Sequence, residues 1–129
     1  ERFRAAGLER AVSQGGCFLS SNLPDGADVA TLIRILHDHD DRHVGPILQA
    51  AHRALAPGGV LLIGEPLAGT PGSEAVGDAY FALYFMAMGS GRPRTFGEMR
   101  TLVLEAGFTS VREIPTHMPM QLRLLVAQH

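Results

Sequence analysis

The chain has 129 residues and a net charge of −2 at pH 7, with 46% hydrophobic and 19% charged residues. This composition is that of one globular domain with one core, and it excludes collagen-like and disordered chains. The 11 basic residues form no long run, which argues against nucleic acid and against a polybasic membrane patch. The sequence has no stretch of 18 apolar residues and starts without an apolar signal region, so we expect a cytoplasmic protein with no transmembrane segment.

The first third of the chain reads as one weakly structured segment followed by a strong strand. Residues 1–8 resemble the end of a helix, with Gly7 near its C-cap. Residues 9–13 are a weak strand candidate, and the pair at 15–16 turns the chain. Residues 28–36 are rich in Val, Ile and Leu, which predicts a strand buried on both faces, as in a parallel sheet.

A helix and a second strand follow. The helix has one apolar face, made by Val44, Ile47, Leu48, Ala51 and Leu55. Asp40 and Asp41 stand where they can cap its start, and Pro57 with two glycines ends it. Residues 60–64 are then a second buried strand, which ends at Glu65.

The last part of the sequence, residues 73–127, predicts two helices and two strands. The helix over 73–88 is apolar nearly all round, which suits core, a subunit interface or the wall of an apolar pocket. Thr95 and Glu98 have capping-box spacing at the start of the next helix. The closing strands, 111–114 and 122–127, are expected to pair antiparallel. The alternation of strands and helices favours an α/β half-sheet.

Ionisable side chains stand at the ends of two neighbouring predicted strands. His37 follows the first strand and Glu65 the second, and ligands in open α/β sheets sit beyond these carboxyl ends. A histidine takes up a proton near neutral pH, and a carboxylate beside it would orient the ring. A histidine bonded only to backbone and a glutamate in a salt bridge are the alternative interpretations.

The acidic and histidine-rich run at 37–43 has a second interpretation as a metal site. Successive residues do not all point at one ion, and no further His or Cys lies at ligand spacing, so we expect no metal there. A solvated cluster that caps the following helix is favoured. A metal-dependent phosphohydrolase built on His37 and Asp38 would need ligands that the sequence does not offer.

Several short motifs occur in one order along nearly the whole chain: Gly15-Gly16-Cys17-Phe18, Leu23-Pro24-x-Gly26-Ala27-Asp28, Arg34-Ile35-Leu36-His37-Asp38-His39-Asp40-Asp41, Leu55-x-Pro57-Gly58-Gly59, Leu62-Ile63-x-Glu65 and Glu105-Ala106-Gly107-Phe108. In this order they resemble the small-molecule O-methyltransferases that use S-adenosylmethionine (SAM). Residues 37–41 and 86–92 look most similar to bacterial carotenoid hydroxyl methyltransferases of the hydroxyneurosporene type. The resemblance implies that residues 1–129 are the carboxyl-terminal portion of the catalytic domain, with a partial Rossmann-like sheet, mostly parallel and closed by an antiparallel strand pair.

The resemblance also implies roles for individual residues. His37 matches the catalytic base and Glu65 a carboxylate that flanks it. The positions that match cofactor contacts are Cys17, Phe18, Ile33 and Arg34.

The sequence departs from the family pattern at several of these points. Cys17 stands where an aspartate usually binds the adenosine, Ile33 replaces a lysine of plant members, and a second flanking glutamate would fall near Pro93. The glycine-rich SAM loop and the amino-terminal dimerisation domain would precede Glu1, so we expect the isolated chain to bind SAM weakly or not at all.

The function that follows is methyl transfer from SAM to a hydroxyl of an apolar small molecule, with a carotenoid as the acceptor suggested by the resemblance. The alternative is a non-catalytic fragment or binding module that keeps half of the sheet without the SAM loop. The long apolar strand at 28–36 would have an unpaired edge, which is a template for association. We therefore expect a homodimer or larger assembly.

Overall fold

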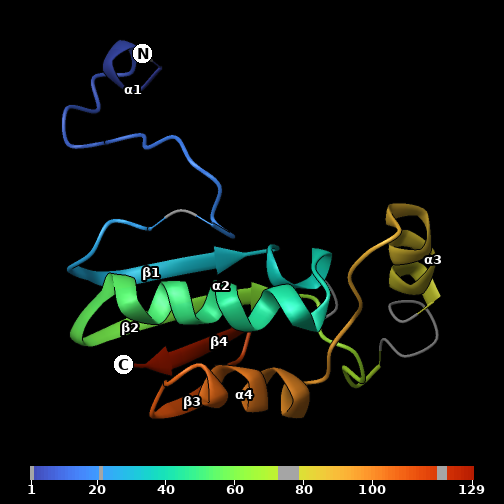
Figure 1. Ribbon diagram of the computed structural model, residues 1–129. Helices are drawn as coiled ribbons and strands as arrows, with labels where there is room; N and C mark the ends of the chain where they lie inside the picture. Colours follow the sequence, from blue (N-terminus) through green and yellow to red (C-terminus); the bar gives the residue numbers. More distant parts are fainter. Residues whose placement is uncertain (1, 21, 73–78, 119–121) are drawn as a thin grey trace.

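The computed structural model describes residues 2–20, 22–72, 79–118 and 122–129, and the architecture below refers to these ranges. Their elements in chain order are α1 (Arg2–Ala5), β1 (Ala27–Ile33), the short 3-10 helix η1 (Leu36–Asp38), α2 (Asp41–Ala54), β2 (Leu55–Glu65), α3 (Ala79–Met88), α4 (Phe96–Glu105), β3 (Ser110–Ile114) and β4 (Arg123–Gln128). The four strands form one sheet, α2 and α4 lie against it, and α1 and α3 stand away from it (Figure 1).

The sheet is partly parallel and partly antiparallel, with the strand order β1-β2-β4-β3. β1 pairs parallel with β2, whereas β4 runs antiparallel to both of its neighbours, β2 and β3. The α/β class and the antiparallel closing pair are confirmed. Of the three pairings within the described residues only one is parallel, so the parallel share is smaller than expected.

β1 ends at Ile33, three residues earlier than the apolar run predicts. Arg34 has a φ of 55°, in the left-handed region, and it turns the chain out of the sheet. The backbone N–H groups of Ile35 and Leu36 then donate to the carboxylate of Glu65. The strand stops here because a side chain of β2 takes these donors in place of a neighbouring strand.

The core lies between the sheet and the pair α2 and α4. The predicted face of α2 is buried, including Val44 and Leu48 at 0% exposure, and it meets Met99 and Val103 of α4. Thr95 and Glu98 form the predicted capping box at the start of α4. The apolar faces that the sequence period predicts for these two helices are therefore the faces that pack against the sheet.

Two sequence predictions are corrected. Residues 9–13 form no strand; they lie in turns and irregular exposed structure. β2 begins at Leu55 rather than at Val60, because Leu55 already pairs with Ala27 of β1, and the register then shifts before Val60 pairs with Val29. The side-chain amide of Gln128 reaches this segment, where Nε2 donates to the carbonyl of Gly58 over 2.8 Å.

α3 does not contribute to the main core. Phe85 is buried, whereas Tyr80, Leu83 and Met86 are 63%, 67% and 77% exposed. The first part of the predicted helix, 73–78, lies outside the described residues. No helix in the described ranges is long and apolar enough to cross a membrane. Of the interpretations of this apolar helix, an interface or a pocket wall fits its exposure better than core.

Candidate active site

His37 and Glu65 meet at the carboxyl end of the parallel strand pair. His37 lies in η1 and Glu65 is the last residue of β2, and they are 3% and 0% exposed. Nδ1 of His37 contacts Oε2 of Glu65, while Oε1 accepts from the N–H groups of Ile35 over 3.0 Å and Leu36 over 2.7 Å. An ionised carboxylate only accepts hydrogen bonds, so the Nδ1 of His37 donates and a neutral ring keeps its lone pair at Nε2.

A second carboxylate faces the other nitrogen of the ring. Oδ1 of Asp38 lies 3.2 Å from Nε2 of His37 and accepts from the hydroxyl of Tyr84 over 3.2 Å. The negative charge of Asp38, followed by burial, raises the pKa of Tyr84 above its usual value. The imidazole therefore stands between two carboxylates, with Glu65 at Nδ1 and Asp38 at Nε2.

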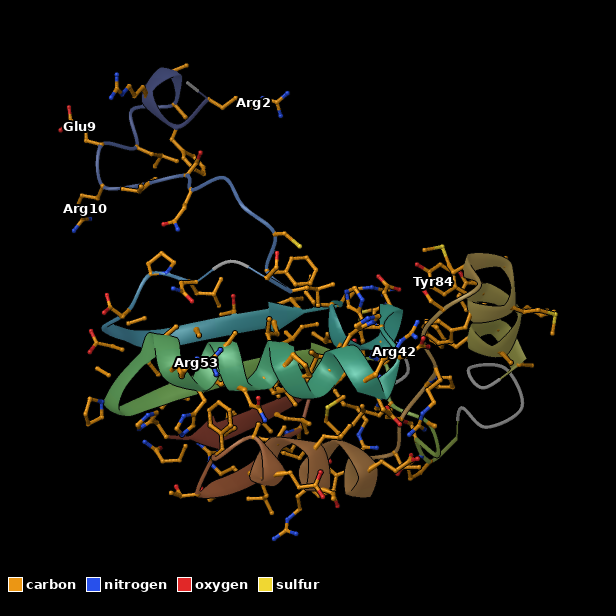
Figure 2. The ribbon with its side chains drawn as sticks, viewed as in Figure 1. Arg2, Glu9, Arg10, Arg42, Arg53 and Tyr84 are labelled. Carbon is orange, nitrogen blue, oxygen red and sulfur yellow. The ribbon has the colours of Figure 1, made fainter. Side chains whose placement is uncertain are left out.

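Aromatic rings of α3 form a wall beside the imidazole. The ring centroids of Phe81, Tyr84 and Phe85 lie 6.4, 6.4 and 5.7 Å from that of His37. Tyr84 lies on the side of α3 that faces the rest of the molecule (Figure 2). The exposed helix thus brings aromatic side chains to the edge of the sheet that carries His37 and Glu65.

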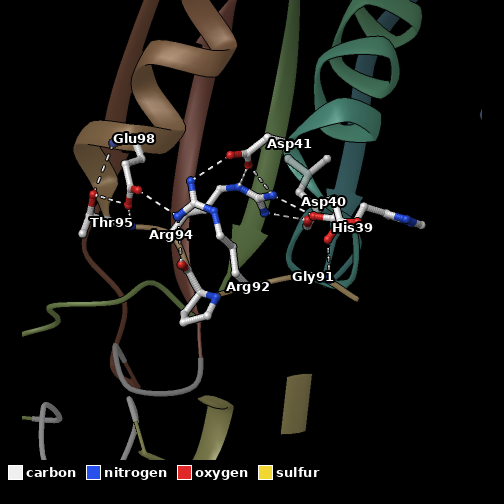
Figure 3. A network of polar contacts seen from close by, with 10 residues as sticks. His39, Asp40, Asp41, Gly91, Arg92, Arg94, Thr95 and Glu98 are labelled. Atoms are coloured by element: carbon white, nitrogen blue, oxygen red, sulfur yellow. Dashed lines mark hydrogen bonds and ion pairs between the residues drawn. The ribbon is translucent and has the colours of Figure 1, made fainter. Parts of the chain in front are cut away.

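A network of charges supports the loop that carries His37 (Figure 3). The guanidinium of Arg94 is buried and bonds the carboxylate of Asp41, which also binds Arg92 over 3.0 Å. Hydrogen bonds from Arg92 and then Arg94 hold the pKa of Asp41 below its usual range. Arg92 in turn donates to Glu98 over 2.8 Å. The network joins the start of α2 to the start of α4.

The acidic residues after His37 bind arginine side chains and a backbone N–H group, and they do not serve only to cap α2. Asp40 occupies the N-cap position of α2, but its side chain accepts from the N–H of Gly91 over 3.1 Å and makes no cap bond. Among the residues that the structure describes, no group of three or more His, Cys, Asp or Glu side chains is arranged to hold a metal ion. The acids serve as partners for arginine and backbone donors.

The four predicted cofactor positions lie at or near the same edge. Ile33 is the last residue of β1 and Arg34 follows it, and both are exposed. The ring of Phe18 packs edge-on against His39 with centroids 5.5 Å apart. Cys17 and Phe18 help to line a shallow hollow of about 260 Å³. A hydrogen bond from the Leu19 backbone lowers the pKa of the Cys17 thiol.

Sequence reasoning missed Arg94 and Tyr84. Both are more than 45 residues from the partners that they bind around His37. The sequence signal that could have indicated Arg94 is the run Arg92-Pro93-Arg94 before the capped helix. Two arginines so close together indicate that acidic side chains bind them.

With this geometry in view, comparison with known proteins defines the class. Residues 1–109 match the O-methyltransferase domain family, and the chain belongs to that family. It is 43% identical over 113 residues to the demethylspheroidene O-methyltransferase of Rhodobacter capsulatus, a match that covers 88% of this chain and 29% of the relative. The chain therefore spans less than a third of that relative's length.

Solved structures agree on the fold. The protein LaPhzM superposes with a TM-score of 0.84 at 31% identity, over 98% of this chain and 37% of that one. Human N-acetylserotonin methyltransferase, whose structure was determined in complex with SAM, superposes with a TM-score of 0.72 at 27% identity, over 89% of this chain and 32% of that one. The sheet and its helices are thus those of SAM-dependent methyltransferases.

Proposed function

We propose that the whole protein carrying this chain transfers a methyl group from SAM to a hydroxyl of an apolar small molecule, with His37 as the general base. The observation that carries the proposal is the buried His37–Glu65 pair at the end of the parallel strands, in a chain of the O-methyltransferase family. Glu65 holds the ring through Nδ1, so Nε2 is the nitrogen that receives a proton.

The chemistry needs one proton acceptor and an in-line approach. SAM, when bound, would supply a methyl group whose bond to the sulfonium sulfur breaks as the bond to the acceptor oxygen forms, and S-adenosylhomocysteine would leave. As the new O–C bond forms, Nε2 of His37 takes the proton of the acceptor hydroxyl. Glu65 and Asp38 then flank the resulting imidazolium. Both carboxylates therefore favour the transition state, in which positive charge develops on the ring.

We infer a cofactor position from the exposed edge beside β1. The ring of Phe18 is 44% exposed next to the hollow, so it offers an aromatic face on which an adenine ring would stack. Cys17, which lines the same hollow, and Ile33 and Arg34 at the end of β1 are the further proposed contacts. A thiol at position 17 accepts hydrogen bonds poorly, so this contact would contribute less binding free energy for the cofactor than a carboxylate would.

The acceptor is proposed to be apolar, and a demethylated carotenoid is the specific candidate. The aromatic side chains of α3 adjoin His37, and the exposed Leu83 and Met86 extend the apolar surface. The name of the relative from Rhodobacter capsulatus specifies a demethylated carotenoid as its acceptor. A long polyene would need such an extended apolar surface beside the base.

The test is His37→Ala in the whole protein, with His117→Ala, at an exposed position of the chain, as the matched control. We expect His37→Ala to lower methyl transfer to a hydroxylated demethyl-carotenoid by about 10²-fold or more. SAM binding measured by calorimetry should be retained, and His117→Ala should behave as the wild type.

Near-normal turnover in a correctly folded His37→Ala protein would overturn the base assignment. Methyl transfer to small aromatic hydroxyls but not to the carotenoid would overturn only the acceptor. A wild-type protein that transfers no methyl group would favour a non-catalytic role.

A further inference from the structure

We propose that Arg94 is a positioning residue for this reaction, whose guanidinium holds the backbone on both sides of His37. The inference rests on the proposed function, because it assigns Arg94 a role in orienting the base. Neither the motif comparison nor the strand-end argument points to this residue.

Arg94 is a buried charge whose side chain donates to the backbone on both sides of His37 and to Asp41 at the start of α2. Its side chain is 1% exposed, and arginine is almost never fully buried unless it is paired. Nη1 donates to the carbonyl of Leu36 over 2.8 Å, Nη2 to the carbonyl of His39 over 2.6 Å, and Nε to Oδ1 of Asp41 over 2.8 Å. One planar group thus spans the residues just before and after His37 and Asp38.

The peptide groups around the base are held from two sides. The N–H of Leu36 donates to Glu65, and its carbonyl accepts from Arg94. The carbonyl of His37 itself accepts from the backbone N–H of Arg92 over 3.1 Å. The direction of the imidazole therefore depends on Glu65 through the side chain and on residues 92–94 through the backbone.

The segment that carries Arg94 lies in direct contact with this loop. Gly91 has a φ of +81°, and a Cβ at this position would lie 2.2 Å from the carbonyl oxygen of His37. Ser90 adds a hydrogen bond from its hydroxyl to the carbonyl of Asp38 over 3.1 Å. Because residues 90–91 pack directly against the carbonyls of His37 and Asp38, the segment brings Arg94 within hydrogen-bonding distance of the same loop.

A lysine cannot replace this arrangement. Guanidinium presents several donors in a rigid plane, whereas an ammonium is a compact point charge. Arg94→Lys keeps the positive charge near Asp41 but cannot serve the carbonyls of Leu36 and His39 at the same time. The control for an arginine-to-lysine change is Arg100→Lys, because Arg100 is an exposed residue of α4 and is not part of the charge network described above.

The experiment measures turnover of the whole protein. We expect Arg94→Lys to lower kcat by about 10-fold or more, with the KM of the acceptor within about twofold of the wild type, because a small misplacement of a catalytic group is costly. Arg100→Lys should stay within about twofold in both constants. A wild-type kcat in Arg94→Lys, or an equal loss in Arg100→Lys, would overturn the proposal.

A second measurement separates this proposal from the proposed function. In protein labelled with ¹³C at the Cε1 atoms of histidine, the His37 resonance should move in Arg94→Lys and not in Arg100→Lys. If the wild type transfers no methyl group, the proposed function fails, and this signal alone decides on Arg94. An unchanged His37 resonance in Arg94→Lys would then contradict the positioning role.

A third variant covers the case in which Arg94→Lys does not fold. Asp41→Asn removes the carboxylate that anchors Arg94 and leaves both carbonyls in place. We expect a smaller loss of kcat and a shift of the His37 resonance in this variant. Wild-type values for both would overturn the proposal.

Discussion

Glu65 is the side chain on which the candidate base depends most. It is fully buried at the end of β2 and accepts from two backbone N–H groups as well as contacting His37. A buried carboxylate is costly unless donors surround it. The two backbone donors offset the cost of burying the carboxylate, and they also end β1. The contact of Oε2 with Nδ1 sets the tautomer of the imidazole.

Glu65→Gln tests this dependence at the residue scale. The carbonyl oxygen of the substituted side chain can still accept from Ile35 and Leu36, but its amide nitrogen would donate to Nδ1 of His37. The ring proton then moves to Nε2, and the lone pair that takes the substrate proton is lost. We expect methyl transfer by the whole protein to fall by about 10²-fold or more while the fold is retained.

The measurement is turnover combined with ¹⁵N NMR of the imidazole, which distinguishes the two tautomers. Glu113→Gln is the control, since Glu113 is half-buried in β3 and pairs with Arg123. Wild-type turnover in Glu65→Gln would show that Glu65 does not select the tautomer.

At the scale of elements, the start of α4 combines helix capping with the support of the active-site loop. Thr95 and Glu98 cap each other's backbone groups, and Glu98 also binds Arg92. The backbone N–H of Thr95, followed by Arg92, lowers the pKa of Glu98 to about 2. The ionised form is therefore favoured in the folded chain.

This pKa gives a stability prediction with a defined sign. Because the folded pKa lies below the usual value of 4.5, the stabilisation by Glu98 is complete above about pH 4.5 and is lost as the pH falls towards about 2. Glu98→Gln should cost about 0.5–1 kcal/mol of unfolding free energy at pH 7, because the side chain is partly exposed and its interactions are screened.

Urea unfolding of wild type and Glu98→Gln at a series of pH values measures this difference. We expect the difference to narrow between about pH 4.5 and 2, with Glu105→Gln at the other end of α4 as the control for loss of charge alone. A difference that stays constant over this range would contradict the assigned pKa.

At the scale of the whole molecule, large apolar side chains of β1 and α3 remain exposed. β1 stands at the edge of the sheet that the structure describes, and its residues Val29 and Ile33 are 55% and 46% exposed. α3 exposes Leu83 and Met86. An open strand edge and a contiguous apolar surface both favour association.

We predict that the 129-residue chain by itself forms dimers or larger assemblies. Light scattering at tens of micromolar protein should give at least twice the monomer mass, and Leu83→Glu should reduce it if α3 takes part. A stable monomer at that concentration would show that neither surface drives association.

Much of this architecture was predictable because it depends on neighbours in the sequence. The buried face of α2 follows from its 3.6-residue period, and the α4 cap from the spacing of Thr95 and Glu98. His37 and Glu65 were found because each directly follows an apolar run, and parallel strands end at a common edge.

Where the prediction was wrong or left alternatives open, the apolar pattern was too short or had no preferred face. Residues 9–13 have no periodicity long enough to define a strand, and the structure shows none there. α3 is apolar on all sides, so its sequence has no preferred face and could not indicate which side chain, here Phe85, becomes buried.

The sequence by itself thus determined the local elements and the two strand ends that carry the candidate base and its carboxylate. Only the tertiary structure decided how that base is held. The end of β1 depends on Glu65, which lies 30 residues beyond the donor Ile35, and the support of His37 depends on Arg94, 58 residues beyond the acceptor Leu36. Such contacts follow from folding, which brings distant donors to buried acceptors that no local pattern records.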